Sequence, residues 1–164
     1  GVVFQDYRLL PRLTVFENIA FALEVIGMKK VDIRRRVREV LELVSLEDKA
    51  KSFPSELSGG QQQRAAIGRA IANHPKVLIA DEPTGNLDSL NARELMEYFV
   101  KINEEKHTTI IMVTHDPQIA SYSSKLIYIT DGKIVKELER KNMSQKDYFY
   151  EIMKITSTDA QLFF

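Results

Sequence analysis

Short apolar runs alternate along the chain with longer segments in which apolar residues recur at helical spacing. Val77–Ala80 and Thr109–Thr114 are dominated by continuous apolar residues, and Gly1–Gln5 has the pattern of the end of another such run. Strands that are apolar throughout are typical of sheets with both faces covered. We therefore predict three buried strands, with Val77–Ala80 at the centre of the sheet.

A hairpin is predicted nearer the carboxyl end. The turn dipeptide Asp131-Gly132 separates two strand-like runs, Lys125–Thr130 and Lys133–Leu138. Because Asp-Gly adopts the tight turn that joins antiparallel strands, this pattern is a strong hairpin signal.

Helical spacing fills the intervals between the strands. Thr14 and Glu17 form a capping-box pattern before the apolar run Ile19–Ile26, and Gly27 ends that helix. Asp32 is the expected N-cap of a second helix. The apolar stripe of this second helix consists of Ile33, Val37, Val40, Leu41 and Val44.

Three further helices follow. One begins at Ser58 and continues to about Asn73, another covers Asn91–Glu105, and the last is capped by Ser144 and continues to Ile155. The stripe of the second of these is Leu95, Met96, Phe99 and Ile102. Helices that alternate with buried strands predict an α/β layered sheet in one domain.

Composition narrows the possible functions. The 164 residues carry 23 Lys plus Arg against 23 Asp plus Glu, so the formal net charge is zero and bulk nucleic-acid binding is disfavoured. The absence of cysteine excludes disulfide scaffolds, thiolate metal sites and cysteine nucleophiles. No apolar stretch approaches the ~18 residues of a membrane span, so we expect no direct membrane insertion. Because the sequence starts at Gly1 and enters an apolar run at once, we expect it to start inside a domain.

A basic face on the second predicted helix changes this picture little. At zero net charge, a solvated surface is favoured over contacts with RNA or lipid headgroups. The face consists of Arg34, Arg35, Arg36 and Arg38.

Two carboxylates follow the central predicted strand. Asp81 and Glu82 stand where Val77–Ala80 ends, and ligands of open α/β sheets bind beyond the carboxyl ends of the strands. Asp81 is a candidate ligand of Mg²⁺, and Glu82 is a candidate to polarise a water molecule. The alternative is an acidic strand end that meets a loop.

A glycine-containing turn precedes the helix that begins at Ser58. Gly59 and Gly60 let the backbone approach a ligand closely, and a helix N-terminus offers unpaired N–H groups to anions. The Ser58 hydroxyl either caps the helix or donates to a phosphate oxygen, and we do not expect it to do both easily. The alternative is a loop followed by an ordinary cap.

The motifs occur together and in a fixed order. LSGGQQQR at 57–64 is followed by LIADEPTGNLD at 78–88 and VTHD at 113–116, and Gln5 follows an upstream strand end. This combination resembles the ATP-binding cassette (ABC) ATPases over nearly the whole chain. In that family these segments are the signature motif, the Walker B strand with the D-loop, the switch histidine and the Q-loop.

The resemblance implies a role for each residue of one nucleotide site. Asp81 would hold Mg²⁺ through water, and Glu82 would act as general base or orient the attacking water. His115 would contact the γ-phosphate of ATP. Gln5 would contact the metal and the lytic water and link the site to a membrane partner. Without the resemblance, His115 would be a packed or capping histidine and Gln5 an ordinary loop residue.

The resemblance also implies that two subunits form each site. Ser58, Gly59, Gly60 and Gln61 of the signature motif would cradle the γ-phosphate of ATP held by a second ABC ATPase subunit, in a head-to-tail dimer. Asp88 would organise the contact between the subunits.

One family motif is absent from the 164 residues. The phosphate loop G-x-x-x-x-G-K-[ST] does not occur, and this loop supplies most donors to the β- and γ-phosphates. We therefore expect a P-loop NTPase-type α/β sheet that is truncated at its N-terminus. We also expect this chain alone to bind MgATP weakly and to hydrolyse none. The expected parts are a helical subdomain (about 12–73), a core (74–140) and a C-terminal helix and tail (141–164).

The D-loop and the segment after the Q-loop indicate the branch of the family. Gly85-Asn86 in DEPTGNLD resembles the lipoprotein-release, macrolide-export and cell-division ATPases, which implies an exporter or mechanotransmission type. The tail Lys141–Ile155 resembles that of bacterial peptide-antibiotic exporters and sensors, and the alternative is a terminal amphipathic helix that only packs on the domain. The group implies a cytoplasmic location at the inner face of a bacterial plasma membrane.

A transmembrane permease is the expected partner at Asp6–Glu17. The apolar anchors expected for its coupling helix are Tyr7, Leu9, Leu10 and Leu13. Packing of these residues beneath the helical subdomain is the alternative. At the level of the whole chain, the alternative function is a non-catalytic truncated cassette that acts as an interaction module.

Overall fold

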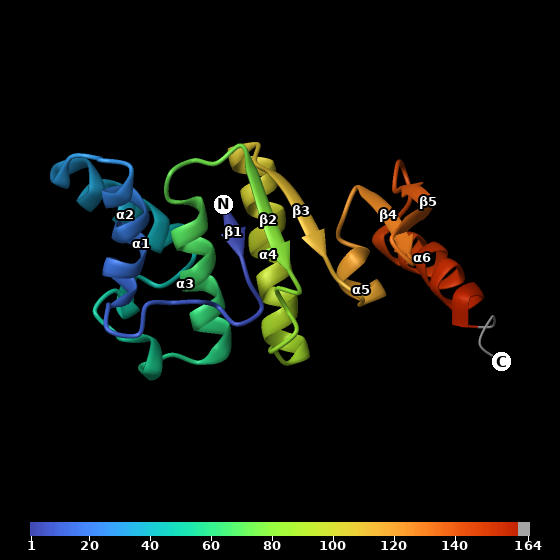
Figure 1. Cartoon of the computed structure of the whole chain (residues 1–164), viewed down its shortest axis with the longest axis horizontal. Coiled ribbons are helices and arrows are strands. Elements are labelled where there is room, and N and C mark those ends of the chain that lie inside the picture. The colour runs from blue at the N-terminus through green and yellow to red at the C-terminus, as the bar shows by residue number, and fades with distance from the viewer. Residues whose placement is uncertain (161–164) are drawn as a thin grey trace. The chain divides into compact units, whose positions relative to one another are not determined.

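The computed structural model describes residues 1–160 and divides the chain into two compact units (Figure 1). The first unit comprises Gly1–Val113, and the second begins at Thr114. The first contains the sheet and the helical layer that position the signature and Walker B residues, and the second contains the hairpin.

A three-stranded parallel sheet forms the middle of the first unit. Its order is β1 (Val2–Val3), β2 (Val77–Asp81) and β3 (Thr109–Val113). Helix α4 (Ser89–Lys106) connects β2 to β3. The strand pairing brings Asp81 opposite Val113, so the carboxyl ends of β2 and β3 lie at one edge of the sheet. The predicted α/β sheet with β2 at its centre is thereby confirmed.

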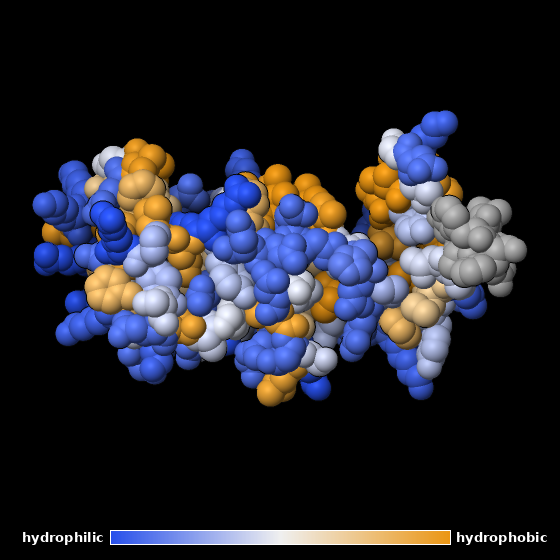
Figure 2. Space-filling view, turned by 60° about the horizontal axis from the view of Figure 1, so that its bottom comes forward, coloured by the Kyte–Doolittle hydropathy of each residue, from blue (hydrophilic) through white to orange (hydrophobic). Residues whose placement is uncertain are grey.

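The predicted burial of both sheet faces is wrong within residues 1–113. Leu78 and Ala80 are fully buried, whereas Val77 and Ile79 on the other face of β2 are 41% and 43% exposed. On β3, Ile111 is 52% exposed. Helices α3 and α4 contact the sheet through β1 and β3, and the exposures show that helices of this unit cover only one face. Figure 2 shows hydrophobic surface over the part of the unit where β2 and β3 run.

Three helices pack together beside the sheet. They are α1 (Val15–Val25), α2 (Lys30–Leu43) and α3 (Gly59–Ile71). Two short 3-10 turns, η1 (Glu47–Lys49) and η2 (Pro54–Glu56), connect α2 to α3. The shared core consists of fully buried side chains that include Ile19, Leu23, Val37, Val40 and Ile67.

The start of α2 differs from the prediction. The N-cap is Lys29, which makes no side-chain cap bond, and Asp32 instead lies in the first turn. There its carboxylate accepts a hydrogen bond from Arg35 at 3.2 Å. The first turn of the helix therefore extends two residues upstream of the predicted cap, and Asp32 supplies favourable negative charge near the N-terminus.

One arginine of the predicted solvated face is in fact enclosed. The Arg36 side chain is only 12% exposed, against 74% for Arg35. Its guanidinium donates to the carbonyl oxygens of Ala72 at 2.8 Å and Ile71 at 3.1 Å. Arg36 thus donates to carbonyl groups at the C-terminus of α3, which receive no hydrogen bond from an N–H group of the helix itself.

The second unit contains a hairpin between two helices. Its elements are α5 (Pro117–Ala120), β4 (Lys125–Thr130), β5 (Lys133–Glu139) and α6 (Gln145–Ala160). Both turn residues of the hairpin have positive φ, 50° at Asp131 and 73° at Gly132, as the predicted tight turn requires. The Ser144 hydroxyl accepts from the Asp147 N–H at 3.1 Å, which confirms the predicted cap of α6. No helix within residues 1–160 is long and apolar enough to cross a membrane.

Candidate functional site

The two predicted acidic residues lie at the carboxyl edge of the sheet. Asp81 is the last residue of β2 and is exposed, and Glu82 follows it and is half-buried. The Glu82 N–H donates to the Val113 carbonyl at 3.0 Å, and its own carbonyl accepts from Gly85 at 3.1 Å. Glu82 has φ 41°, a left-handed conformation that is costly for a residue other than glycine. Such strained residues cluster at functional sites.

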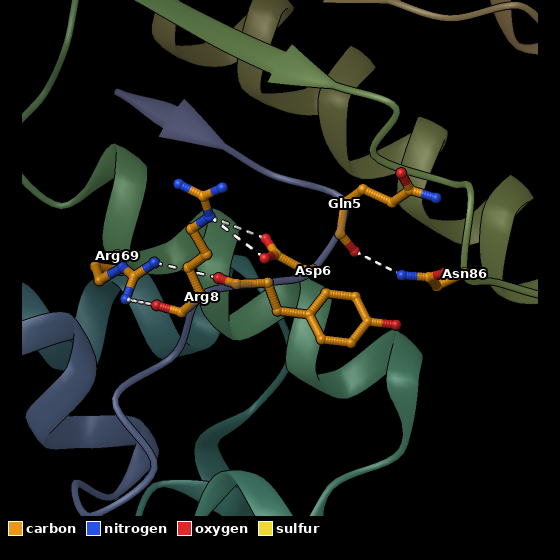
Figure 3. A network of polar contacts seen from close by, with 6 residues as sticks. Gln5, Asp6, Arg8, Arg69 and Asn86 are labelled. Atoms are coloured by element: carbon orange, nitrogen blue, oxygen red, sulfur yellow. Dashed lines mark hydrogen bonds and ion pairs between the residues drawn. The ribbon is translucent and has the colours of Figure 1, made fainter.

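Gln5 lies against the loop that follows these carboxylates. Its main-chain carbonyl accepts a hydrogen bond from the Asn86 amide at 2.9 Å (Figure 3). A Cβ added to Gly85 would lie 2.5 Å from the Gln5 side-chain nitrogen, so a larger residue would displace the Gln5 amide from this loop. The structure therefore brings Gln5 together with the loop that continues from Asp81 and Glu82.

The signature motif forms the first turn of α3. Ser58 is the N-cap, and its hydroxyl accepts from the Gln61 N–H at 3.3 Å. In return, the Gln61 side chain accepts from the Ser58 N–H at 3.0 Å. Because an accepting hydroxyl keeps its own proton, Ser58 can cap the helix and still donate to a phosphate oxygen. The N–H groups of Gly59 and Gly60 belong to the first turn, where helices provide no acceptor.

Asp88 performs a local role that the sequence analysis missed. It is the N-cap of α4, and its carboxylate accepts from the Asn91 backbone at 2.9 Å and from the Asn91 side chain at 2.7 Å. These hydrogen bonds hold the pKa of Asp88 below its ordinary value. A Cβ on Gly60 would collide with the side chain of Asn91. The signature turn and the start of α4 are therefore in direct contact.

His115 belongs to the second unit, where it is exposed. The next residue, Asp116, caps α5 by accepting from the Gln118 N–H at 2.7 Å. Strand β3 ends at Val113, the residue that pairs with Asp81. His115 lies two residues further along the chain.

Gln63 was not predicted from the sequence as a site residue. It is fully buried, and its side-chain amide donates to the Pro83 carbonyl at 2.7 Å. The signature helix is thus attached to the residue after Glu82. The Oε1 atom of Gln63 has no hydrogen-bond partner among the described residues. One sequence signal could have identified Gln63. It is a glutamine four residues before Ile67, at a position of the helical stripe where an apolar residue is expected.

The oxygen ligands at the sheet edge suit a partly hydrated Mg²⁺ better than an ion enclosed by protein side chains alone. Among the side chains described, residues 1–157, no cluster of three or more His, Cys, Asp or Glu could hold an ion. Mg²⁺ in nucleotide sites is bound by one or two carboxylates together with waters and phosphate oxygens. An exposed Asp81 at the sheet edge is a donor of this kind.

The segment Asp6–Glu17 is a loop followed by the first turn of α1. Asn18, which is fully buried, accepts from the Leu10 N–H at 2.8 Å and donates to the carbonyls of Leu10, Leu13 and Thr14. Beside this loop lies a shallow groove of about 420 Å³. Its apolar lining includes Leu10, Phe21, Val25 and Ile26.

The four predicted docking residues, Tyr7, Leu9, Leu10 and Leu13, are all half-buried. A half-buried side chain contacts its own unit and still presents surface, so this burial accommodates the predicted docking as well as the alternative of internal packing.

Comparison with known proteins decides the family. Residues 1–85 match the sequence model of the family described as ABC transporter. The chain belongs to the ABC transporter family. Its fold is the ABC ATPase cassette fold, as the resemblance implied.

The relatives lie in the group that the D-loop indicated. The cell division ATP-binding protein FtsE of Streptococcus pneumoniae is 58% identical over 138 residues, which cover 84% of this chain and 60% of the relative. The bacitracin export ATP-binding protein BceA of Halalkalibacterium halodurans is 40% identical over 154 residues, 94% of this chain and 61% of the relative. This chain therefore spans about 60% of the length of these relatives.

A solved structure has the same fold. The ATP-binding cassette MJ0796, solved as a dimer in a post-hydrolysis state with ADP and Pi, superimposes with a TM-score of 0.75 and 39% sequence identity. The match covers 87% of this chain and 63% of the MJ0796 chain.

Proposed function

We propose that the chain forms part of an ATP-binding and ATP-hydrolysing subunit that powers a membrane transporter of the exporter or mechanotransmission type. One observation carries the proposal. Gln5, the loop after Glu82, and the signature turn contact one another, directly or through Asn91, within a single unit. Phosphoryl transfer depends on positioning and charge stabilisation, and this unit holds its polar groups close together. The names of the relatives, a cell division protein and a bacitracin export protein, support this branch.

In this proposal, the sheet edge carries the hydrolytic groups. Glu82 orients or deprotonates the attacking water, since it directly follows the end of β2 at the sheet edge. Asp81 would hold Mg²⁺ through water. When bound, Mg²⁺ would neutralise charge that develops on the phosphate oxygens. Gln5 would contact the metal and the lytic water, and His115 would contact the γ-phosphate.

The signature turn serves the nucleotide of a second ATPase subunit in a head-to-tail dimer. The hydroxyl proton of Ser58 and the first-turn N–H groups of Gly59 and Gly60 point to an anion as ligand, because a helix N-terminus favours negative charge. Gln61 holds the cap in shape and adds no negative charge. Asp88 shapes the adjoining contact through Asn91. The dimeric structure of the related cassette supports this arrangement.

The segment Asp6–Glu17 and the neighbouring groove receive the transmembrane permease. Leu10 lies in both, and Phe21, Val25 and Ile26 extend the apolar surface along α1. An amphipathic coupling helix binds such a groove through its apolar face. Attachment to a permease would place the chain in the cytoplasm, at the inner face of a bacterial plasma membrane.

The second candidate is a non-catalytic interaction module. The 164 residues contain no G-x-x-x-x-G-K-[ST] loop, and this observation favours weak MgATP binding and no hydrolysis by this chain alone. The subdivision into a helical subdomain (about 12–73), a core (74–140) and a C-terminal helix and tail (141–164) belongs to the first proposal, that of a partial ATPase domain.

Phosphate release separates the two candidates. It is measured for the chain alone and for the chain joined to a family phosphate-loop segment, each with and without Glu82→Gln. We expect hydrolysis only from the joined protein, and a loss of ~10²–10⁴-fold with Glu82→Gln. Hydrolysis unaffected by Glu82→Gln would show that Glu82 is not the base. A folded joined protein without hydrolysis would favour the interaction module.

A further inference from the structure

The turn after Gln5 is held in an unfavourable backbone conformation. Tyr7 and Arg8 have φ of 59° and 46°, and two successive non-glycine residues in the left-handed region are rare because their Cβ atoms crowd the following carbonyls. Within the turn, the Tyr7 N–H donates to Phe4 at 3.2 Å and the Arg8 N–H donates to Asp6 at 2.6 Å, and the Arg8 side chain pairs with the Asp6 carboxylate at 3.1 Å. These contacts are all local to residues 4–8. The surrounding structure must therefore stabilise it.

Arg69 supplies that stabilisation from α3. Its Nη1 donates to the Arg8 carbonyl at 2.6 Å, and its Nη2 donates to the Tyr7 carbonyl at 3.2 Å (Figure 3). The guanidinium fork thus engages the carbonyls of both strained residues. Partial burial lowers the pKa of Arg69, and among the side chains described, residues 1–157, no carboxylate forms an ion pair with it. Its half-buried charge is used on the backbone of this turn.

Tyr7 extends from the same turn to the opposite end of α3. Its hydroxyl oxygen lies 3.0 Å from where a Cβ on Gly59 would stand. Burial raises the pKa of the Tyr7 phenol. Gly59 and Arg69 are ten residues apart, which is about 15 Å along a helix. The turn therefore contacts α3 near its C-terminus through Arg69 and at its N-terminus through Tyr7.

We propose that Arg69 is a positioning residue, which holds the Gln5–Arg8 turn so that Tyr7 sets the position of the signature turn at Gly59. The inference rests on the proposed function, in which the segment from Asp6 receives the permease. Arg69 also lines the groove beside that segment. A partner that displaces the Gln5–Arg8 turn would therefore move Gly59 of the same subunit through the phenol of Tyr7.

Amide hydrogen exchange of the ¹⁵N-labelled chain, followed by NMR, tests the role of Arg69. Arg69→Lys keeps the charge but loses the fork. We expect the exchange of the Tyr7 and Arg8 amides to accelerate roughly ten- to hundredfold, because two charge-assisted hydrogen bonds are lost. We also expect the Gly59 amide resonance to shift.

Arg36→Lys is the matched control. Arg36 also donates to two successive backbone carbonyls of the first unit, those of Ile71 and Ala72, but it does not contact the turn. We expect it to leave the Gly59 resonance and the exchange at Tyr7 and Arg8 unchanged. If both lysine variants accelerate exchange at Tyr7 and Arg8 equally, Arg69 only contributes to general stability and the proposal is wrong.

Gly59→Ala tests the other contact without touching Arg69. An alanine Cβ would press on the Tyr7 hydroxyl, so we expect exchange at Arg8 to rise several-fold. Adding Tyr7→Phe removes the crowded oxygen and should restore the original rate. Unchanged exchange in Gly59→Ala would overturn the proposal. None of these measurements involves ATP or a permease, so their result is separate from that of the phosphate-release experiment.

Discussion

The N-termini of α1 and α3 are built from the same capping box but present opposite electrostatic surfaces. At α1, the Thr14 N–H and hydroxyl both donate to the Glu17 carboxylate at 2.8 Å. At α3, the Gln61 amide oxygen accepts only the Ser58 N–H, at 3.0 Å. Within the described chain, the Ser58 hydroxyl proton has no acceptor.

The two caps differ in whether the N-terminus of the helix remains available to an anionic ligand. At α1 the Val15 and Phe16 N–H groups already donate to the carbonyls of Ser52 and Ala50, each at 2.9 Å, and the Glu17 carboxylate complements the dipole, so an anionic ligand gains nothing there. A neutral amide over α3 keeps the cap shape and leaves the positive end of the dipole for a phosphate. One capping motif therefore serves stability in one helix and, in the proposed function, ligand binding in the other.

Adding a negative charge to the α3 cap should have the largest effect on ATP-dependent dimerisation. Gln61→Glu preserves the capping box, but it places a carboxylate where the γ-phosphate of the second subunit is proposed to bind. Like charges ~4 Å apart repel by about 4 kcal/mol at an effective dielectric constant near 20. We expect ATP-dependent dimerisation of the chain joined to a phosphate-loop segment to weaken at least about a hundredfold, as measured by light scattering.

The reverse exchange in α1 is the control for Gln61→Glu. Glu17→Gln makes the same isosteric change in a cap of the same shape, and we expect ATP-dependent dimerisation to be unchanged. Equal weakening by the two variants would contradict the distinction between an open and a closed cap.

Gln63 tests whether the cap alone determines the position of the signature turn. In Gln63→Leu, the buried Pro83 carbonyl loses its 2.7 Å hydrogen bond, and an unsatisfied buried group costs about 1–3 kcal/mol. We expect that loss in urea unfolding of the chain. Gln62 is the matched neighbour, since its half-buried side chain donates to Leu57 at 3.2 Å. A Gln62→Leu variant that costs as much as Gln63→Leu would show that Gln63 has no special importance.

Removing the cap hydroxyl from each helix sharpens the comparison. Thr14→Ala and Ser58→Ala should each lower the free energy of unfolding by about 1 kcal/mol, the usual contribution of an N-cap. Only Ser58→Ala should also weaken ATP-dependent dimerisation, because the Thr14 proton is already donated to Glu17. Urea unfolding and light scattering on both variants measure the two effects. Identical dimerisation in the two variants would remove the proposed ligand role of Ser58.

The cap residues also show which helix boundaries can be predicted from the sequence. The Thr14 box and the Ser144 cap were predicted because their partners lie within one turn, and the structure confirms both. The N-cap of α2 was predicted incorrectly, because the helix begins at a lysine that makes no side-chain cap. Local spacing detects caps only where a side chain makes them.

Contacts between distant segments could not be predicted in this way. Arg36 was assigned to a solvated face, but it donates to carbonyls 35 and 36 residues away. Gln63 and Arg69 bind carbonyls of Pro83 and of the Gln5–Arg8 turn, 20 residues away or more. A backbone carbonyl carries no sequence signal, so side chains that recognise one become visible only in the fold.

Lowering the pH should have the smallest effect on stability. It distinguishes the two caps because the α1 cap contains a titratable carboxylate, Glu17, and the α3 cap contains a neutral amide. Hydrogen bonds from the Thr14 backbone and side chain lower the pKa of Glu17 from its ordinary 4.5. A carboxylate with a depressed pKa in the folded state stabilises the fold above its unfolded pKa, and this contribution is lost as the pH falls through the folded pKa. We therefore expect the unfolding free energy to decline below about pH 4.5. Urea unfolding from pH 7 to pH 3 should show a shallower decline in Glu17→Gln, whereas Gln61→Glu should add a new one. A decline of the same slope in Glu17→Gln would mean that the α1 cap does not depend on the charge of Glu17.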